Sequence, residues 1–325
     1  MHSKKGVVEI QFNWIFAIIA GAIIIILFTT IILKQKESSE TAANLMIIKN
    51  LDVIWSGSET TIGTVNIIKI PKTKIEFRCN GYSIWNSPKQ LNTMNVFVPS
   101  VLDGDRIIST TLGWGIPYRA TNLVYLTNPK IRYIFIAEDD NEFANKIYDM
   151  VPDEIRKNKY TSAALIKDEN DDEVRIVFFD QEPAVTNNLK GIKKVTALKI
   201  VGDKDKGTVE FFGLVNDIFV SKETSYYIKE ETLLGAIFTD DKEIYDCAMK
   251  SAFKKLNIVS QVYEGRVNEL TAIKPNCIYG TSQIRSILDA SEEFSKSNID
   301  IIDIAAKNLE EQNKNLQKKS CPLIY

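Results

Sequence analysis

An uninterrupted apolar run near the amino terminus constrains this chain more than any other feature of its sequence. Residues 12–33 read FNWIFAIIAGAIIIILFTTIIL and carry no formal charge over 22 residues. At about 1.5 Å of rise per residue, a helix of that length spans the roughly 30 Å hydrocarbon core of a bilayer. Lipid cannot satisfy backbone polar groups, so the segment must be helical. The sequence therefore predicts one transmembrane helix.

The flanks of this run distinguish a retained anchor from a cleaved secretory signal. A cleaved signal has an apolar region of about 7–15 residues and a small-residue cleavage site. Here the run is longer and continues into the polar sequence KQKESSE, which begins at Lys34. We therefore expect the helix to stay in the mature protein, preceded by a polar head at residues 1–11 and followed by a juxtamembrane helix or stalk at residues 34–60.

Two resemblances concern this amino-terminal segment. Lys4-Lys5-Gly6, followed by Glu9 and an apolar helix, resembles the class III signal of pilin-like proteins, which implies cleavage after Gly6 with the helix retained. Glu9 is the third residue after Gly6, whereas that family has its glutamate at the fifth. The run GVVEIQFNWIFAIIAGAIIII also resembles the amino ends of uncharacterised single-pass membrane proteins of small-genome archaea, over about the first 40 residues. That resemblance implies a location and no known activity.

The direction of crossing is less strongly marked. Two lysines flank each end of the run (Lys4 and Lys5, Lys34 and Lys36), so the positive-inside rule is nearly balanced. The short head favours a cytoplasmic amino terminus with the large domain outside, although an exported domain often carries an Asn-x-Ser/Thr sequon and this chain has none. We expect a single-pass membrane protein with an extracytoplasmic domain.

Composition limits the chemistry of the remaining chain. Of 325 residues, 45% are hydrophobic and 25% charged, enough for a full globular core. The net charge is −2, which disfavours nucleic-acid binding. The only histidine is His2, which removes the commonest general base and metal ligand from the main domain. The sequence predicts no cofactor, no metal and no nucleic-acid partner; the lipid bilayer and other membrane or envelope proteins are the expected partners.

The chain after the anchor predicts a mixed α/β or α+β domain at residues 61–275, with a mixed sheet. Short β-type runs dominate up to Pro129, and Asn80-Gly81 between two of them predicts a hairpin. Two later units share one shape, a strand, paired acids and a helix, which is either an internal duplication or chance. The first is 131–137 with a helix at 141–150, and the second is 234–239 with a helix from 242. Further predicted strands are 162–167, 173–179, 195–201 and 207–214, with the DENDD sequence of 168–172 as a hairpin tip.

Residues 276–325 predict an antiparallel helical hairpin with a packed tail. Two amphipathic helices, 282–294 and 298–318, are joined by a short turn. Cys277 precedes the first helix and Cys321 follows the second, so both lie at one end of the hairpin, as a disulfide requires. The alternative is a pair of buried free thiols in a reducing compartment. Cys79 and Cys247 are a second candidate pair, with nothing in the sequence to bring them together.

The stretch Gly113–Arg119 predicts an aromatic turn. Trp114, Tyr118 and Arg119 could form a binding loop. The alternative, which we favour, is a tight turn whose aromatic side chains fold back on the core, because aromatic residues serve mostly in burial.

The paired acids are candidate ligand sites. Glu138, Asp139 and Asp140, with Asp180 after a later strand, resemble the acidic pocket of receiver domains over about 50 residues. The helix that this family has between the two strands is replaced here by the DENDD sequence, and no partner lysine follows. Asp240 and Asp241 form the second cluster. Helix caps and solvated acids are the alternative, and Ca²⁺ or Mg²⁺ binding is a third reading.

Together these features favour a membrane-anchored, non-enzymatic protein whose extracytoplasmic α/β domain serves binding or envelope assembly. One alternative is a pilin-like filament subunit that assembles through its first helix. Another is a membrane-tethered hydrolase that uses carboxylates near Asp139 and Asp240.

Overall fold

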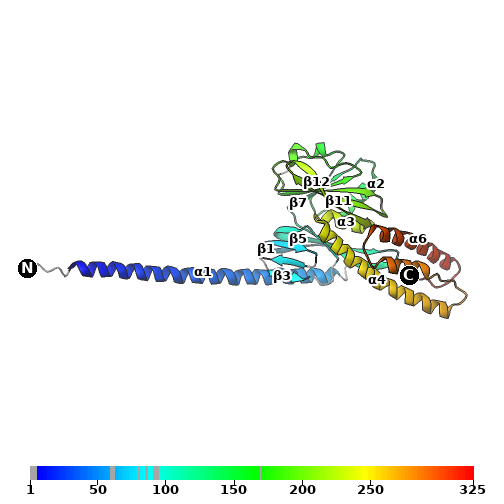
Figure 1. The fold of residues 1–325 in the computed structure, drawn as a ribbon, viewed down its shortest axis with the longest axis horizontal. Helices are drawn as coiled ribbons and strands as arrows, with labels where there is room; N and C mark the ends of the chain where they lie inside the picture. The colour runs from blue at the N-terminus through cyan, green and yellow to red at the C-terminus, as the bar shows by residue number, and fades with distance from the viewer. Residues whose placement is uncertain (1–5, 59–62, 80, 85–86, 91–94, 169) are drawn as a thin grey trace, which may run out of the picture. The chain divides into compact units, whose positions relative to one another are not determined.

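The computed structural model describes residues 6–58, 63–79, 81–84, 87–90, 95–168 and 170–325. The chain divides into two compact units, Met1–Leu51 and Asp52–Tyr325. Figure 1 labels the helices and strands along the chain.

The first unit is made by helix α1 (Gly6–Ser58), which is unbroken over 53 residues and extends past the unit boundary. Within it, Trp14–Lys36 is long and apolar enough to cross a membrane, and none of this span is buried. Among the described residues it is the one helix with these properties. The predicted amino-terminal apolar helix is therefore confirmed. The helix continues through the predicted stalk and ends one residue after Gly57.

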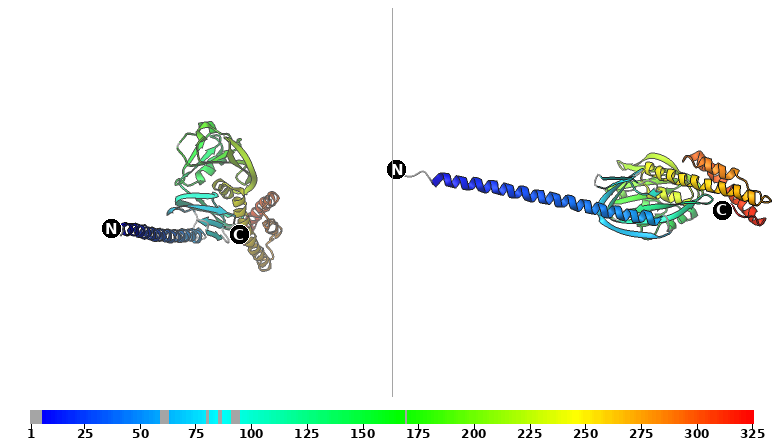
Figure 2. Two further views of the ribbon diagram at one scale, coloured as in Figure 1. Left: turned by 60° about the vertical axis from the view of Figure 1, so that its left-hand side comes forward. Right: turned by 90° about the horizontal axis from the view of Figure 1, so that it is seen from below.

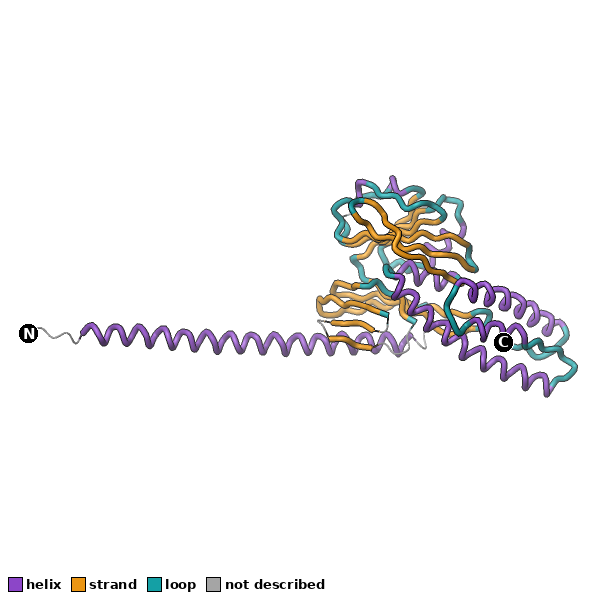
Figure 3. The backbone as a smooth tube through the Cα atoms, in the orientation of Figure 1, coloured by secondary structure: helices purple, strands orange, loops and turns teal. Residues whose placement is uncertain are grey.

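The second unit contains two sheets, which Figure 3 shows as two groups of strands. Sheet A is six-stranded in the order β3-β2-β1-β5-β6-β4, antiparallel except for the parallel β4–β6 pair. Its strands are β1 (Val65–Arg78), β2 (Gly81–Ile84), β3 (Ser87–Gln90), β4 (Val96–Phe97), β5 (Val101–Gly115) and β6 (Arg119–Thr127). Arg78 pairs with Gly81, so the predicted hairpin is present, although Asn80 itself lies outside the described residues.

Sheet B is six-stranded in the order β12-β11-β10-β9-β7-β8. The β8–β7–β9–β10 portion is parallel, and β11 and β12 continue it antiparallel. Its strands are β7 (Ile131–Ile136), β8 (Lys157–Tyr160), β9 (Glu173–Phe179), β10 (Lys194–Gly202), β11 (Lys206–Val215) and β12 (Ile218–Ile228). Helix α2 (Glu142–Met150) connects β7 to β8. The mixed α/β class is therefore confirmed.

The segment before β9 differs from the prediction. Residues 162–167, predicted as a strand, contain only a 3-10 turn at Ala163–Leu165, and the DENDD sequence is not a hairpin tip. The reason is pairing, because β7 and β10 occupy both sides of β9, so β9 cannot form a hairpin with the segment that immediately precedes it. The segment instead covers one face of sheet B, where Ala163 and Ile166 join the hydrophobic core.

In the second predicted strand–acid–helix unit the helix from residue 242 is present, but the strand is wrong. Residues 234–239 belong to helix α3 (Glu230–Phe238), so the two units are not repeats. A short apolar run cannot be assigned to strand or helix by periodicity alone. Here the helix is apolar all round because it lies between the sheets and contacts β4, β5 and β6 of sheet A as well as β11 and β12 of sheet B (Figure 1). Every residue from Thr232 to Phe238 is buried.

Gly235 allows α3 to approach sheet A closely. A Cβ atom at this position would lie 2.6 Å from the ring of Phe97, which is fully buried on β4. The Phe97 ring stacks on Tyr125 of β6 and tilts against Tyr245 of the next helix. It therefore has no free space into which it could move.

Three further helices complete the second unit. They are α4 (Lys242–Ile273), α5 (Ser282–Ala290) and α6 (Lys296–Lys318). α5 contacts both α4 and α6, and the second view in Figure 2 shows them at the carboxy-terminal end of the chain. The carboxy-terminal tail packs down as predicted, with Ile324 fully buried.

Two disulfides tie these helices to the rest of the unit and to each other. Cys277 and Cys321 are bonded across the base of the α5–α6 hairpin, with Cα atoms 5.9 Å apart, so the two helices are antiparallel as predicted. Cys79, at the end of β1, is bonded to Cys247 of α4, with Cα atoms 5.3 Å apart. The sequence offered no reason for this second pair; docking of α4 on sheet A supplies it.

The close approach at Gly235 leads to the first prediction. Gly235→Ala should lower the free energy of unfolding by about 1–2 kcal/mol, because the added methyl group forces the buried Phe97 ring to move and this outweighs the better helix propensity of alanine. Denaturant unfolding of the full chain in detergent micelles measures the change.

Gly265→Ala provides the matched control. Gly265 lies in α4 with no heavy atom within 4 Å of the added carbon, so this substitution should raise the free energy of unfolding by up to about 1 kcal/mol. Equal effects of the two substitutions would contradict the close packing of α3 on sheet A.

Candidate functional site

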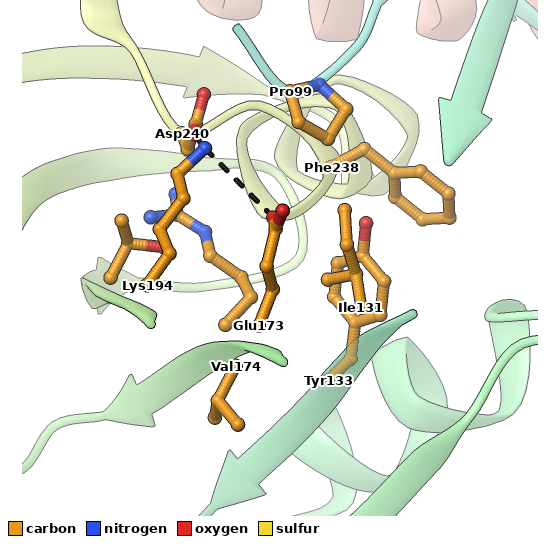
Figure 4. A pocket seen from close by; sticks show the side chains of 10 residues that line it. Pro99, Ile131, Tyr133, Glu173, Val174, Lys194, Phe238 and Asp240 are labelled. Atoms are coloured by element: carbon orange, nitrogen blue, oxygen red, sulfur yellow. Dashed lines mark ion pairs between the residues drawn. The ribbon is translucent and has the colours of Figure 1, made fainter. Parts of the chain in front are cut away.

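A small charged pocket lies where three parallel strands of sheet B begin. Ile131, Glu173 and Lys194 are the first residues of β7, β9 and β10, and Asp240 reaches the same place from the α3–α4 connection. Figure 4 shows their side chains converging beside Pro99 and Phe238. Ligands of open α/β sheets bind at the carboxyl ends of the strands, whereas this pocket lies at their amino ends.

Asp240 is the best-connected group in this pocket. Its carboxylate accepts hydrogen bonds from the backbone N–H of Ser100 at 2.6 Å and from the Ser100 hydroxyl at 3.1 Å, and it forms an ion pair with Lys194 at 2.5 Å. Burial by itself raises the pKa of Asp240, but Lys194 and the Ser100 N–H outweigh that effect and hold the pKa below its usual value. The side chain therefore joins sheet A to sheet B as an ionised group.

Glu173 behaves in the opposite way. Burial raises its pKa, which Lys194, at 4.0 Å, only partly offsets, and the nearby charge of Asp240 adds to the increase. The ionised form of Glu173 is thus less favourable in the folded protein than in the unfolded chain. Two carboxylates beside one lysine have pKa values shifted in opposite directions.

Arg175 forms the floor of the pocket. Its guanidinium is buried and donates hydrogen bonds to the carbonyl oxygens of Ala236 at 3.0 Å, Ile237 at 3.3 Å and Thr239 at 2.6 Å, which lie at the end of α3. A fourth bond goes to the carbonyl of Ala197 on β10. Burial lowers the pKa of Arg175 to about 10, which leaves the group charged at neutral pH.

The dimensions of the pocket decide what it can do. The space open to water is about 10 Å³, which is room for one water molecule. Arg175, Lys194, Glu173 and Asp240 carry charges that sum to zero. The arrangement fits a buried polar joint between the two sheets and leaves no room for a substrate.

The first acidic cluster lies elsewhere. Glu138, Asp139 and Asp140 are exposed and follow the carboxyl end of β7, whereas Asp240 lies beside its amino end. The two ends of β7 are separated by the length of its six residues, which is roughly 20 Å. The cap of α2 is Asn141, whose side chain accepts from the N–H of Ala144, and not Asp140. Among the described residues, no three acids, histidines or cysteines are grouped so as to hold a metal.

Asp241 and Asp180 have clear positions. Asp241 caps α4 by accepting hydrogen bonds from the N–H groups of Glu243 and Ile244, which is the capping role considered for the paired acids. Asp180 is exposed at the end of β9, at the same edge of the sheet as Glu138.

The aromatic turn folds inward. Trp114 is 1% exposed and donates to the carbonyl of Ile228, and Tyr118 is 2% exposed and bonds to the hydroxyl of Ser260 on α4. Burial raises the pKa of Tyr118 to about 12. Arg119 alone is exposed and bonds to Asn122. The two rings therefore lie in the core, where they fill the space between sheet A and α4. This arrangement is that of a tight turn with inward-facing aromatic side chains, and not that of a binding loop.

Sequence reasoning missed the most deeply buried carboxylate. Asp171, within the DENDD sequence, forms ion pairs with Arg132 of β7 at 2.6 Å and with Arg156 at 2.7 Å, and its side chain is 1% exposed. Arginines inside the apolar runs IRYIFI and EVRIVFF were the available signal, because a charge in a buried strand needs a partner.

An open groove lies on another side of the second unit. The β12–α6 groove is lined by Thr224, Ser225 and Tyr226 of β12, Lys242 and Asp246 of α4, Phe294, and Ser295, Lys296, Ser297 and Asp300 at the start of α6. Its water-accessible volume is about 700 Å³, within the usual range of ligand sites. Hydroxyl groups and charges of both signs dominate its lining.

The opposite pKa shifts lead to a second prediction. Asp240→Asn should lower the free energy of unfolding by about 1–3 kcal/mol at pH 7, because Lys194 and Arg175 lose the nearby negative charge. The folded pKa of Asp240 lies below its unfolded value, so this contribution is complete above about pH 4 and is lost as the pH falls further. Unfolding curves of wild type and variant should therefore converge in acid.

Glu173→Gln is the paired variant. The folded pKa of Glu173 is raised, so its ionisation opposes folding once the pH rises from its unfolded value near 4.5 through the raised folded value. The substitution should leave stability unchanged or raise it by less than about 1 kcal/mol at pH 7. A loss as large as that of Asp240→Asn would contradict the assignment of the two roles.

Comparison with known proteins adds no relative. No protein-family model matches this chain, no curated protein matches its sequence, and no solved structure matches its fold.

Proposed function

We propose that this protein is anchored in the cell membrane by one helix, crosses it once, and presents its α/β domain outside the cytoplasm, where that domain binds a ligand or an envelope component. The proposal rests on physical features of the two units. It needs no catalytic group.

The pairing of the cysteines carries the proposal. Described cysteines are all disulfide-bonded, in two bonds that do not overlap along the chain. Structural disulfides persist in oxidising compartments and are rare in the cytosol. An amino-terminal apolar helix combined with disulfides is typical of membrane-bound or secreted proteins with an extracytoplasmic domain.

A binding role is supported by the β12–α6 groove. It is open to solvent, whereas the charged pocket at the start of sheet B has room for one water molecule. The acids of the hydrolase alternative, Asp139 and Asp240, lie at opposite ends of β7 and cannot act on one bond. The geometry therefore favours ligand binding over hydrolysis by this pair.

A pilin-like filament subunit is the second candidate, and one observation favours it. Helix α1 is unbroken over the 53 described residues from Gly6 to Ser58. Cleavage after Gly6 would leave the helix intact. Its exposed apolar side chains could then pack against other copies of the same helix within the membrane.

Sidedness gives the third prediction. Protease added to intact cells should digest the second unit if it lies outside, whereas a cytoplasmic control protein stays intact. Non-reducing peptide mapping of the same material should recover Cys79–Cys247 and Cys277–Cys321 as linked peptides. Protection of the domain, together with free thiols at these positions, would falsify an extracytoplasmic location.

Removal of each disulfide tests its structural role. Replacing both cysteines of either pair by serine should lower the free energy of unfolding by about 3–5 kcal/mol, because each bond restricts the unfolded chain. The loops close over sequence separations of 168 and 44 residues, so the Cys79–Cys247 pair should have the larger effect. Thermal unfolding with and without reductant provides the measurement.

The mature amino terminus separates the two candidates. Mass spectrometry of the purified protein should find a terminus at Met1 or His2 if the protein is a simple single-pass anchor. A terminus at Val7 would instead support the pilin-like route, because it requires cleavage after Gly6.

A further inference from the structure

We infer that the β12–α6 groove is a binding site for an uncharged saccharide; this inference rests on the binding function proposed above. Three properties of the groove carry the argument: its balanced charge, its unused hydrogen-bonding groups and its aromatic side chains.

The charges of the groove are largely paired within the protein. Asp246 accepts from Lys242 at 2.7 Å and from the hydroxyl of Ser225, and Asp300 accepts from Lys206 at 2.6 Å. A phosphate or carboxylate ligand would meet two carboxylates, and a metal ion would meet the ammonium groups of Lys242 and Lys296. The lining therefore selects against ligands with a strong charge of either sign.

Hydrogen-bonding capacity remains at the surface of the groove. Within the described part of the chain, the ammonium of Lys296 and the hydroxyls of Thr224 and Tyr226 make no hydrogen bond to other protein groups and face solvent or the groove. Asp300 is half exposed, with acceptor positions beyond the one that Lys206 occupies. The groove thus presents both donors and acceptors to solvent. Hydroxyl groups of a saccharide both donate and accept hydrogen bonds, so they can pair with the donors and with the acceptors of the groove.

The aromatic side chains supply an apolar contact. Phe294 lines the groove while its ring packs edge-on against Phe253 at 5.2 Å and against Tyr245 at 6.5 Å, so its position is fixed from behind. Tyr226 faces the groove from β12. A sugar ring offers C–H groups to aromatic rings and hydroxyls to the polar rim, which is the combination present here.

An extended peptide is the main competing occupant, since β12 is an edge strand of sheet B. A peptide that adds as a further strand needs unpaired N–H and C=O groups along β12. The carbonyl of Tyr226 on this strand already accepts a hydrogen bond from the hydroxyl of Tyr245. The register also shifts opposite Lys222 and Glu223, which bends and charges the edge. These features favour a ligand held by side chains.

The test uses the full chain in lipid nanodiscs, immobilised for biolayer interferometry. The probes are neutral hexasaccharides of glucose, of mannose and of N-acetylglucosamine, with inorganic phosphate, Ca²⁺ and an uncharged hexapeptide as comparison ligands. We expect saturable binding of at least one hexasaccharide. Thr224→Ala, Tyr226→Phe and Lys296→Ala should each weaken it about two- to tenfold, as expected for the loss of one hydrogen bond.

Lys314→Ala is the matched control for Lys296→Ala, because both lysines are exposed on α6 and only Lys296 lines the groove. Lys314→Ala should leave binding unchanged, and circular dichroism should show all variants folded. The inference is overturned if none of the hexasaccharides binds, if a variant that combines Thr224→Ala, Tyr226→Phe and Lys296→Ala binds as well as wild type, or if only phosphate, Ca²⁺ or the peptide binds. Sidedness from protease digestion is measured separately, so failure here leaves the anchored, extracytoplasmic arrangement intact.

Discussion

The guanidinium of Arg175 donates hydrogen bonds to the last carbonyl groups of α3 and so holds the carboxyl end of that helix against the middle of sheet B. The last carbonyl groups of a helix have no partner within it, and α3 ends between two sheets, where water cannot reach them. A buried arginine on β9 supplies the missing donors. Loss of that side chain would leave several buried acceptors unsatisfied at once, which is among the most destabilising changes a core can suffer.

This constraint explains why polar groups gather at one edge of sheet B. A buried positive charge requires a nearby negative one, and Asp240 provides it one residue after Thr239, whose carbonyl Arg175 binds. Asp240 in turn binds Ser100, in the connection between β4 and β5 of sheet A, and Lys194 of β10 in sheet B. The charged pocket is therefore the outer layer of the same joint, which accounts for its balanced charge and small volume.

The β12–α6 groove has a different origin. It is formed where β12, α4 and the start of α6 meet, and its position depends on the α5–α6 hairpin, which the Cys277–Cys321 bond closes. An ion network also holds α6 against sheet B: Lys206 contacts Asp300 and Asp303, and Lys307 contacts Asp303 and Asp205. Rigid support of this kind is what a binding surface on a helix terminus requires.

The amino-acid sequence by itself determined the apolar helix, the mixed α/β class, the Asn80-Gly81 hairpin and the Cys277–Cys321 bond. Each follows from a local pattern: length and apolarity, alternating composition, a turn dipeptide, or two cysteines at one end of a short hairpin. Tertiary structure alone decided that residues 234–239 form a helix and that Cys79 reaches Cys247. It also decided that Asp171 is buried against Arg132 and Arg156, and that Asp240 is buried against Lys194. These depend on segments far apart in the chain, and a short apolar run or an isolated acid carries no record of what will pack against it.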